Sequence, residues 1–415
     1  NKAKDNLYYI GDFKPDFLMK EGDIITPLTE QAIGLLGSTA IIPESGKYIQ
    51  SQDVAKIVCK EHLLDKDFAF YLISSNLVKQ QLSAAAQQTK IRHTSPDKIK
   101  DCIVWIPELE EQKRIGKLLR TIDLKIELNR QLNHNLEAMA KQLYDYWFVQ
   151  FDFPDENGKP YKSSGGKMVW DKRLKREIPL LWKAKIVEEV ADVYNGATPS
   201  TVNELNYGGD IVWITPKDLS DQKQKFVYQG ERNISQVGYD SCSTHLLPSN
   251  TILMSSRAPI GLLAIAKTEL CTNQGFKSFV SKSKNIATYL YYYLQYHITQ
   301  IEQLGTGTTF KEVSREDILK FPMLKPSDNV LDLWEEIVSA LNDRQLEIQK
   351  ENENLIKQRD ELLPLLMNGQ VSVNYDLAET GFILFCISIA TKICFQLIKS
   401  IIVNSVLIIA FYINP

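Results

Sequence analysis

The stretch EQKRIGKLLRTIDLKIELNRQLNHNLEAMAKQLYDYWF, residues 111–148, decides the fold of this protein. It contains no proline, and every seventh position carries a residue that suits a helix interface, namely Ile115, Ile122, Asn129, Leu136 and Leu143. A seven-residue repeat is typical of a helix that packs along its length against another helix. A helix of 40 residues would be about 60 Å long. The asparagine would fix the register of such a pair at some cost in stability.

A second stretch with the same pattern follows Pro326. Its residues at seven-residue spacing are Trp334, Leu341, Ile348, Leu355 and Leu362. Pro364 and Gly369 are the signals that would stop this helix. Each helix has one apolar stripe and a charged remainder, so each needs a partner, and the obvious partner is the other helix. We therefore predict an antiparallel pair of long helices. The alternative is a pair of ordinary bundle helices within one domain.

The residues before the two helices resemble each other. LMKEGDII at 18–25, followed by IGLL at 33–36, matches LLPSNTIL at 246–253, followed by IGLL at 260–263. Similar segments that keep their order and nearly constant spacing indicate a tandem duplication. The sequence therefore predicts the order domain, helix, domain, helix.

The two copies differ in length at their start. A further matching pair, TKI at 89–91 and TTF at 308–310, keeps the same order. About 50 residues that precede the match in the second copy have no equivalent in the first, which begins at Asn1 instead of methionine. We therefore expect the first domain to be incomplete at its N-terminus.

The predicted fold class is mixed α/β (α+β), with two tandem domains separated by two long antiparallel coiled-coil helices. The expected parts are a first domain (1–107), a first helix (108–148), an exposed linker rich in Gly, Ser, Pro and charge (149–178), a second domain (179–326), a second helix (327–368) and an apolar tail (369–415). The apolar runs of the tail are broken by Lys392 and Asn404. We expect a non-native C-terminus there and not a membrane anchor.

Composition and motifs argue against catalysis. The six cysteines form no Cys-x-x-Cys pair and the five histidines show no ligand spacing, so we expect reduced thiols, no metal site and a cytoplasmic protein. The sequence has no Gly-x-x-x-x-Gly-Lys-Ser/Thr phosphate loop, no Gly-x-Gly-x-x-Gly motif and no Asn-Pro-Pro-aromatic motif. We therefore predict a non-catalytic chain with no cofactor of its own. With a net charge of -3, any DNA-binding surface must be a local patch.

Polar and basic side chains gather where strand ends and loops are expected. Arg, Lys, Asn and Gln are the side chains that read purine edges or grip phosphates. In the second domain, the candidates for DNA contact are Lys217, Arg257, Asn273, Gln274, Lys277, Thr309 and Lys311. In the first domain, they are Lys47, Gln50, Lys90 and Arg92. The alternative is that these residues are solvated surface charges and turn caps.

Several of these segments resemble one known family. They are IPELEEQKRIGKLLRTIDLKIELNRQLNHNLEAMAKQLYDYWFVQFDFP (106–154), IPLLWKAKIVEEVADVYNGATPS (178–200), RAPIG (257–261), TNQGFK (272–277) and QRDELLPLLMNGQV (358–371). Together they resemble the specificity subunit of type I restriction-modification systems. The resemblance implies two target-recognition domains that read the two halves of a split site in double-stranded DNA, spaced by the helix pair.

The resemblance also implies partners. Two modification (methyltransferase) subunits and restriction subunits, which are ATP-dependent nucleases, would dock on this chain, and a membrane is not expected to be a partner. S-adenosylmethionine, ATP and Mg would then belong to those subunits. The rival function from another class is a coiled-coil scaffold with two ligand-binding modules and no role on DNA. A fused restriction enzyme is a second rival, but its methylation motifs are absent from the sequence.

Overall fold

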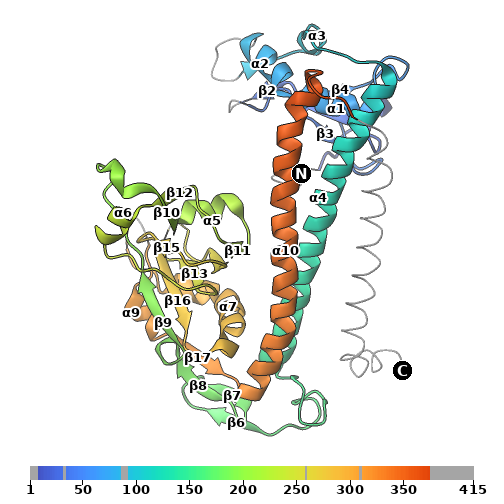
Figure 1. Cartoon of the computed structure of the whole chain (residues 1–415). Coiled ribbons are helices and arrows are strands. Elements are labelled where there is room, and N and C mark those ends of the chain that lie inside the picture. Colours follow the sequence, from blue (N-terminus) through green and yellow to red (C-terminus); the bar gives the residue numbers. More distant parts are fainter. Residues whose placement is uncertain (1–7, 31–33, 86–91, 258, 308–310, 374–415) are drawn as a thin grey trace. The chain divides into compact units, whose positions relative to one another are not determined.

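The computed structural model describes residues 8–30, 34–85, 92–257, 259–307 and 311–373, which fall into two compact units. Unit 1 holds residues up to 130 and from 351 onward, and unit 2 holds residues 131–350. The helices α4 (Leu109–Tyr144) and α10 (Asp328–Met367) are long, as predicted, and contribute residues to both units (Figure 1). The mixed α/β class with two tandem domains and long helices is thereby confirmed.

Unit 1 combines short antiparallel strands with short helices. One sheet has the strand order β3-β1-β4, and β2 pairs separately with β5. The elements are η1 (Pro15–Phe17), β1 (Ile24–Pro27), β2 (Thr29–Glu30), β3 (Ala40–Ile41), β4 (Val54–Ile57), α1 (Lys66–Ser74), α2 (Asn76–Ala85), β5 (Arg92–His93) and α3 (Pro96–Lys100). Each strand is short because turns and polar residues interrupt the alternation of apolar side chains after a few positions.

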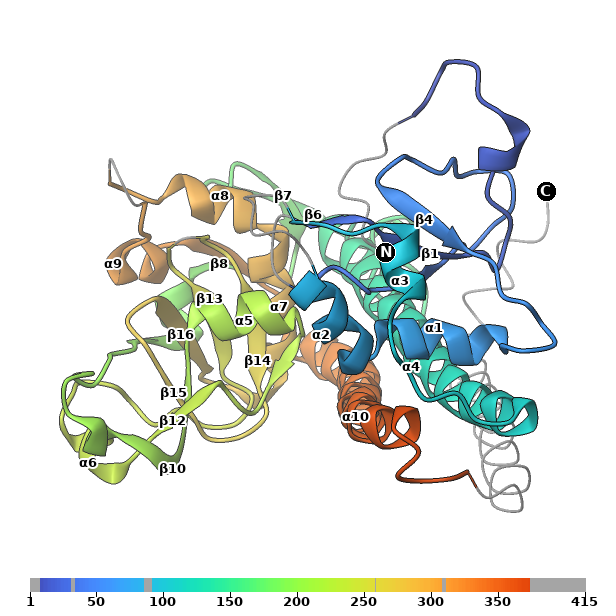
Figure 2. The same ribbon diagram turned by 90° about the horizontal axis from the view of Figure 1, so that it is seen from above.

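Helix α1 lies beside the first turns of α4 (Figure 2). The buried Gln112 side chain of α4 joins the two, because its Oε1 accepts from the Asp65 backbone at 2.9 Å and its Nε2 donates to the Leu63 carbonyl at 3.0 Å. A Cβ at Gly116 would lie 2.7 Å from the Phe68 nitrogen, so this close approach requires glycine. Asp65 caps α1 by accepting from the Phe68 nitrogen at 2.9 Å.

Within unit 1, α4 and α10 pack through a mixture of apolar and polar side chains. Ile115, Ile122 and Leu355 are buried, and Leu362 is partly buried. Asn129 is 2% exposed, and its Nδ2 donates to Glu351 Oε2 at 2.7 Å and to Asn352 Oδ1 at 3.0 Å. This pairing satisfies the amide in one register of the two helices only, which is the arrangement expected of an asparagine at an interface position.

Unit 2 contains larger sheets. The elements before β13 are the π-helical turn η2 (Asp145–Val149), β6 (Met168–Asp171), β7 (Arg176–Pro179), β8 (Lys183–Ile186), η3 (Val187–Glu189), β9 (Ala191–Asn195), η4 (Glu204–Asn206), β10 (Tyr207–Ile214), α5 (Pro216–Gln222), β11 (Phe226–Val227), β12 (Arg232–Ile234) and α6 (Gln236–Asp240). They continue with β13 (Ile252–Ser255), β14 (Leu263–Ala266), β15 (Cys271–Thr272), β16 (Phe276–Ser281), η5 (Lys284–Ile286), α7 (Ala287–Tyr296), α8 (Ile298–Gln303), α9 (Arg315–Leu319) and β17 (Pro322–Lys325). A five-stranded sheet has the order β11-β14-β13-β16-β9, and a three-stranded sheet has the order β12-β10-β15.

The duplication read from the sequence is visible in the strand pairing of each unit. In unit 1, β1 is the central strand between β3 and β4, and both pairings are antiparallel. In unit 2, β13 is central between β14 and β16, again with two antiparallel pairings. The helices α3 and α9 also correspond, because each begins after a serine cap, Ser95 and Ser314. The elements β9 to β12 have no counterpart among the described residues that precede β1.

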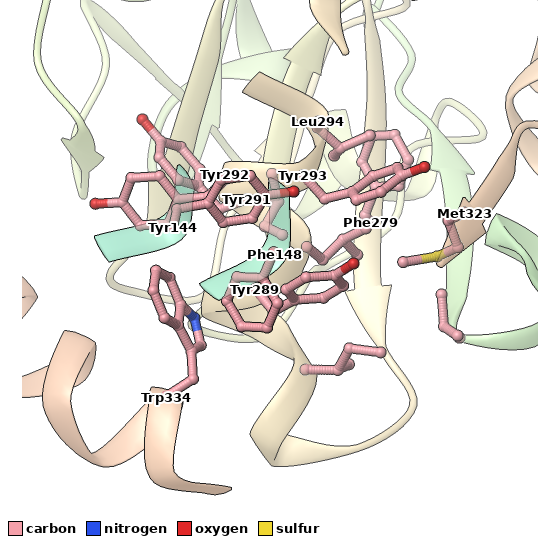
Figure 3. Close-up of a cluster of buried hydrophobic side chains, with 14 of the residues drawn as sticks. Tyr144, Phe148, Phe279, Tyr289, Tyr291, Tyr292, Tyr293, Leu294, Met323 and Trp334 are labelled. Carbon is pink, nitrogen blue, oxygen red and sulfur yellow. The ribbon is translucent and has the colours of Figure 1, made fainter. Parts of the chain in front are cut away.

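The second domain and the helices share one apolar core inside unit 2. Four tyrosines of α7, at 289 and 291–293, are buried together with Tyr144 from the end of α4, Phe148 from η2 and Trp334 from α10 (Figure 3). Leu136, Leu341 and Ile348 of the helix pair belong to the same core, and Leu143 packs partly buried against it. The domain therefore shares this core with the helices, and a second apolar cluster around Leu253 and Phe276 lies within the domain alone.

Two expectations about the helix ends need correction. Residues 149–178 are not simply an exposed linker, because Phe151 and Phe153 are buried. The Phe151 ring meets Trp182 edge-on, and the Phe153 ring stacks on Trp182 with ring centres 4.9 Å apart. Their large apolar surfaces explain this burial. Pro364 does not stop helix α10, which continues to the fully buried Met367, one residue before the expected end at 368. Gly369, with φ of 69°, follows that end. No helix among the described residues is long and apolar enough to cross a membrane, and the tail from residue 374 lies outside them.

Candidate nucleic-acid interface

Five segments of unit 2 meet where its strands begin or end, and we call their joint surface the strand-end surface. The segments are 196–198 after β9, 215–217 after β10, 256–257 after β13, 273–275 between β15 and β16, and 311–313 before α9. Backbone hydrogen bonds join them in pairs: Ala197 N to Thr272 O at 2.9 Å, Asn273 N to Ile214 O at 3.0 Å, Ser256 N to Gly275 O at 2.8 Å, and Val313 N to Ser256 O at 3.0 Å. The surface is thus a connected part of the fold and not a set of separate loops.

Gly196 makes the closest approach within this surface. A Cβ there would lie 2.2 Å from the carbonyl oxygens of both Thr272 and Asn273. Any side chain would force the two segments apart. Gly196 belongs to the sequence NGATPS, near the start of the predicted second domain. Because no larger residue fits at this position, the glycine allows the segments of the strand-end surface to stay in contact.

We expected Lys217 on a loop at a strand end. It lies instead in the first turn of α5. Thr215 caps this helix and forms a capping box with Asp218, which explains why the chain turns into a helix directly after β10. The Lys217 side chain is exposed and its Nζ lies 2.8 Å from Glu231 Oε2. The hydrogen bond to Glu231 raises the pKa of Lys217. An exposed pair of this kind contributes little to stability, so the lysine remains available for an anion.

Asn273 and Gln274 lie on the turn between β15 and β16, as predicted. Asn273 Oδ1 accepts a hydrogen bond from the Gly275 nitrogen at 2.9 Å. Asn273 thus caps the turn, which was the alternative to DNA contact for these residues. Gln274 is exposed, and its Oε1 accepts from the Thr198 hydroxyl. The two amides therefore differ, because Asn273 shapes the turn while Gln274 presents its side chain at the surface.

Arg257 and Lys311 are the cations of the strand-end surface that have no hydrogen-bond or ion-pair partner among the described residues. Arg257 follows β13 and forms an antiparallel bridge with Glu312, which places Lys311 next to it in the structure. Within the described part of the chain, neither the Arg257 guanidinium nor the Lys311 ammonium has a hydrogen bond or an ion pair. Lys311 is exposed and Arg257 partly exposed. Two adjacent unpaired cations are suited to an anionic ligand such as a phosphate backbone.

Lys277 does not lie on a strand-end loop but inside β16, and it is buried. It is 5% exposed, and its Nζ lies 3.2 Å from Glu312 Oε1 and 3.5 Å from Ser256 Oγ. Burial without a counter-charge would be costly, so Glu312 explains how a lysine is tolerated there. In this conformation Lys277 supports the segments 256–257 and 311–313 and does not present its charge to a ligand.

The candidates in unit 1 have different surroundings. Lys47 is exposed and forms a surface ion pair with Glu44 at 2.8 Å, whereas Gln50 Nε2 donates to the Val54 carbonyl at 2.8 Å. Arg92 lies in β5, with its Nη1 3.2 Å from Oε1 of the buried Glu30. Lys90, and Thr309 of the second domain, lie outside the described residues. Of these positions, Lys47 is the one that presents an exposed charge, and Arg92 is largely a structural group.

Replacement of Arg92 by lysine is expected to lower the free energy of unfolding by about 1–3 kcal/mol, because lysine cannot satisfy all three partners of the guanidinium. Besides Glu30, Arg92 Nη2 donates to the Ser83 carbonyl at 2.5 Å and to its hydroxyl at 3.0 Å. Urea denaturation would measure the change. The control is Lys100→Gln, whose ion pair with Asp97 is exposed and should matter little. An unchanged midpoint for Arg92→Lys would contradict the structural role.

Sequence reasoning missed the acidic residues that organise this surface. Glu312 pairs with Lys277, and Glu231 with Lys217. Glu312 directly follows Lys311, so the sequence already placed an acid beside the predicted basic contacts. Nothing near Glu231 in the sequence indicated that it would pair with Lys217. No group of His, Cys, Asp and Glu in the described residues could hold a metal ion.

Comparison with known proteins identifies the family. A family profile described as "Type I restriction modification DNA specificity domain" matches residues 4–138 and 179–358. The chain belongs to this family. The two matched stretches correspond to the two copies of domain and helix read from the sequence. Membership confirms the predicted resemblance, and with it the prediction that the chain is a specificity subunit and not a catalytic one.

Individual specificity subunits are similar to this chain over different lengths. The MjaIX specificity subunit of Methanocaldococcus jannaschii is 35% identical over 197 residues, which is 46% of this chain and 46% of that protein. The chain thus matches about half the length of this relative. The HindI specificity subunit of Haemophilus influenzae is 24% identical over 375 residues, covering 78% of this chain and 81% of the relative. The crystal structure of a type I S subunit from M. genitalium has a TM-score of 0.57 at 16% identity, over 85% of this chain and 84% of that one, which shows the same fold.

Proposed function

We propose that this specificity subunit reads the sequence of double-stranded DNA with its two domains, one for each half of a two-part site. The observation that carries the proposal is the strand-end surface, where Arg257 and Lys311 lie side by side without partners among the described residues. Gln274 is exposed on the same surface. Arginine and glutamine form paired hydrogen bonds with purine edges in the major groove, and lysine binds phosphate as a point charge.

The first domain would read the second half-site. Its strands β3-β1-β4 repeat the arrangement of β14-β13-β16, so the end of β1 corresponds to the end of β13 that precedes Arg257. The positions predicted for DNA contact in this copy are Lys47, Gln50, Lys90 and Arg92. Among the described ones we propose Lys47, whose charge is exposed, as the main contact, because Arg92 is held by Glu30 and Ser83.

The partners that we propose are two modification subunits and restriction subunits, which supply S-adenosylmethionine, ATP and Mg. This proposal rests on family membership and on the absence of catalytic motifs from the sequence. A net charge of -3 is compatible with DNA binding if those subunits also contact the duplex. A cytoplasmic location would follow, because the assembly must meet DNA there.

The test uses the complex of this chain with its modification subunits and a randomised duplex library, from which bound DNA is sequenced. Two separated blocks of preferred bases are expected. Arg257→Gln should cost about 1–3 kcal/mol on the selected site and relax the preference at one position. Lys311→Gln should weaken binding to all sequences and reduce the slope of log K against log salt by about 0.9.

Lys284 provides the matched control, since it is an exposed lysine of η5, which follows the opposite end of β16 from the segment 273–275. Lys284→Gln should change neither the preference nor the salt slope. Recovery of no base preference by the wild-type complex would refute the proposed function. Binding that also lacked salt dependence would favour the scaffold alternative.

A further inference from the structure

Lys225 is a buried lysine of the second domain that contacts both long helices within unit 2. Its side chain is 10% exposed. Its Nζ lies 2.8 Å from Glu137 Oε2 of α4 and 2.8 Å from Asn342 Oδ1 of α10. It also lies 3.1 Å from Gln345 Oε1 and 2.6 Å from the Tyr292 hydroxyl. Four oxygen atoms from three different elements therefore converge on one ammonium group.

Asn342, Gln345 and Gln349 form a stripe of amides along one face of α10, which we call the amide stripe. Their exposed fractions are 2%, 5% and 6%. Gln349 Nε2 donates to Gln224 Oε1 at 2.5 Å and to the Phe226 carbonyl at 2.9 Å. The spacing of three and four residues places all three side chains toward the segment 224–226. The amide stripe thus binds the residues on both sides of Lys225 as well as Lys225 itself.

Such a polar contact is not the most stable way to join a domain to a helix pair. Burial of a charged pair costs several kcal/mol in desolvation, and apolar residues of the same volume are often as stable or more so. The aromatic core around Trp334 already supplies apolar contact, but apolar contact has no direction. The polar groups of the amide stripe are satisfied in one orientation only, because any other orientation leaves a buried lysine or amide without a partner.

The segment 224–226 is also connected to the strand-end surface. It follows α5, whose first turn carries Lys217. Phe226 opens β11, which pairs with β14, and β14 pairs with β13, the strand that precedes Arg257. A change in the position of Lys225 would therefore shift β11, and through the hydrogen bonds between β11, β14 and β13 it would move the residues proposed to contact DNA.

We propose that Lys225 and the amide stripe set the orientation of the second domain on the helices, and thereby the gap between half-sites that the complex accepts. This inference rests on the proposed function and makes Lys225 a positioning residue, which does not itself touch DNA. The length of the helix pair sets the coarse distance between the two domains. The amide stripe fixes the orientation of the second domain relative to the helices.

The experiment uses the complex with the modification subunits and duplexes that carry the selected site with its gap unchanged, lengthened or shortened by one base pair. The main variant is Lys225→Met with Glu137→Gln, which removes both charges together. A milder variant, Gln349→Leu, removes only the contacts to Gln224 and Phe226. The control is Lys223→Met, an exposed lysine two residues away. Gel-shift or filter-binding titrations give the affinity for each gap.

Wild type and the Lys223→Met control should bind the duplex with the preferred gap about tenfold or more tightly than duplexes whose gap differs by one base pair. This is the size of effect expected for one mismatched base pair in a site. The charge variant should lose most of this preference, to about threefold or less, while binding to the best gap changes less. A role in stability alone would lower binding to all gaps equally. If the charge variant does not fold, Gln349→Leu decides, since it should also broaden the gap preference.

Retention of the wild-type gap preference by the folded variants would overturn this inference and leave the proposed function intact. Absence of any base preference in the wild-type complex would instead refute the proposed function, and the gap claim with it. A preference that moves to a different gap, or spreads over several, supports the inference.

Discussion

Trp334→Ala is expected to lower the free energy of unfolding of unit 2 by about 3–5 kcal/mol. The indole is fully buried, and its ring centre lies 4.9 Å from that of Phe148 and 5.7 Å from that of Tyr292 (Figure 3). Removal leaves a large cavity between aromatic rings that come from α4, η2 and α7 and cannot easily collapse. Domains are typically stable by about 5–15 kcal/mol, so the loss would be a large part of the total.

Urea denaturation followed by circular dichroism at 222 nm would measure this loss. Leu333→Ala is the matched control, because Leu333 is the preceding residue of α10 but is 38% exposed. It should cost less than about 1 kcal/mol. Similar midpoints for the two variants would contradict a core shared between the second domain and the helices.

Lys225→Met alone is expected to cost up to about 3–5 kcal/mol, because it removes the closest counter-charge of the largely buried Glu137 and leaves only the more distant Lys141. In wild type, burial lowers the pKa of Lys225 to about 8, against the opposing effect of Glu137. Burial alone would raise the pKa of Glu137, but the charge and hydrogen bond of Lys225 hold it below its usual value. Without Lys225, only Lys141, with its Nζ 3.8 Å from Glu137 Oε1, and the Tyr292 hydroxyl still oppose the effect of burial, so the pKa of Glu137 should rise.

The sign of the pH dependence follows from this rise. A carboxyl group whose pKa is higher in the folded state stabilises the fold at low pH and loses that contribution as the pH rises. The deficit of Lys225→Met relative to wild type should therefore be smaller at pH 5 than at pH 8. Addition of Glu137→Gln should recover part of the stability at pH 8 and remove the pH dependence of the deficit. Urea midpoints at both pH values test this, with Lys223→Met as control, and a deficit independent of pH would exclude a buried carboxylate as its cause.

The long helices were predictable because their signal is periodic and repeated. Ile115 and Ile348 are fully buried, as the seven-residue spacing requires. Asn129 was also expected at the interface, and the structure supplies its partners, Glu351 and Asn352. The duplicated segments predicted equivalent strands, and β1 and β13 occupy equivalent positions in their sheets. These features depend on residues close in sequence or on a repeat, which a single chain displays.

The environment of each charge was not predictable in the same way. Lys277 and Lys311 are both basic residues near strand ends, yet one is buried beside Glu312 and the other exposed. Arg92 aligns with Lys311 in the duplication but binds a buried glutamate instead. Each outcome depends on an acid brought close by the fold. The amide stripe had a visible signal, three amides at helical spacing, but its partner Lys225 lies far away in sequence.

The core shared by α7, α4 and α10 limits how far the second recognition domain can serve as an interchangeable module. A chimera joined at residues 179 and 326 would carry the α7 tyrosines but leave Tyr144, Phe148 and Trp334 with the recipient. A grafted domain therefore has to match both the shape of that aromatic surface and the charge of Glu137. Chimeras that exchange target specificity should fold most readily when the adjoining ends of both helices are transferred together with the domain.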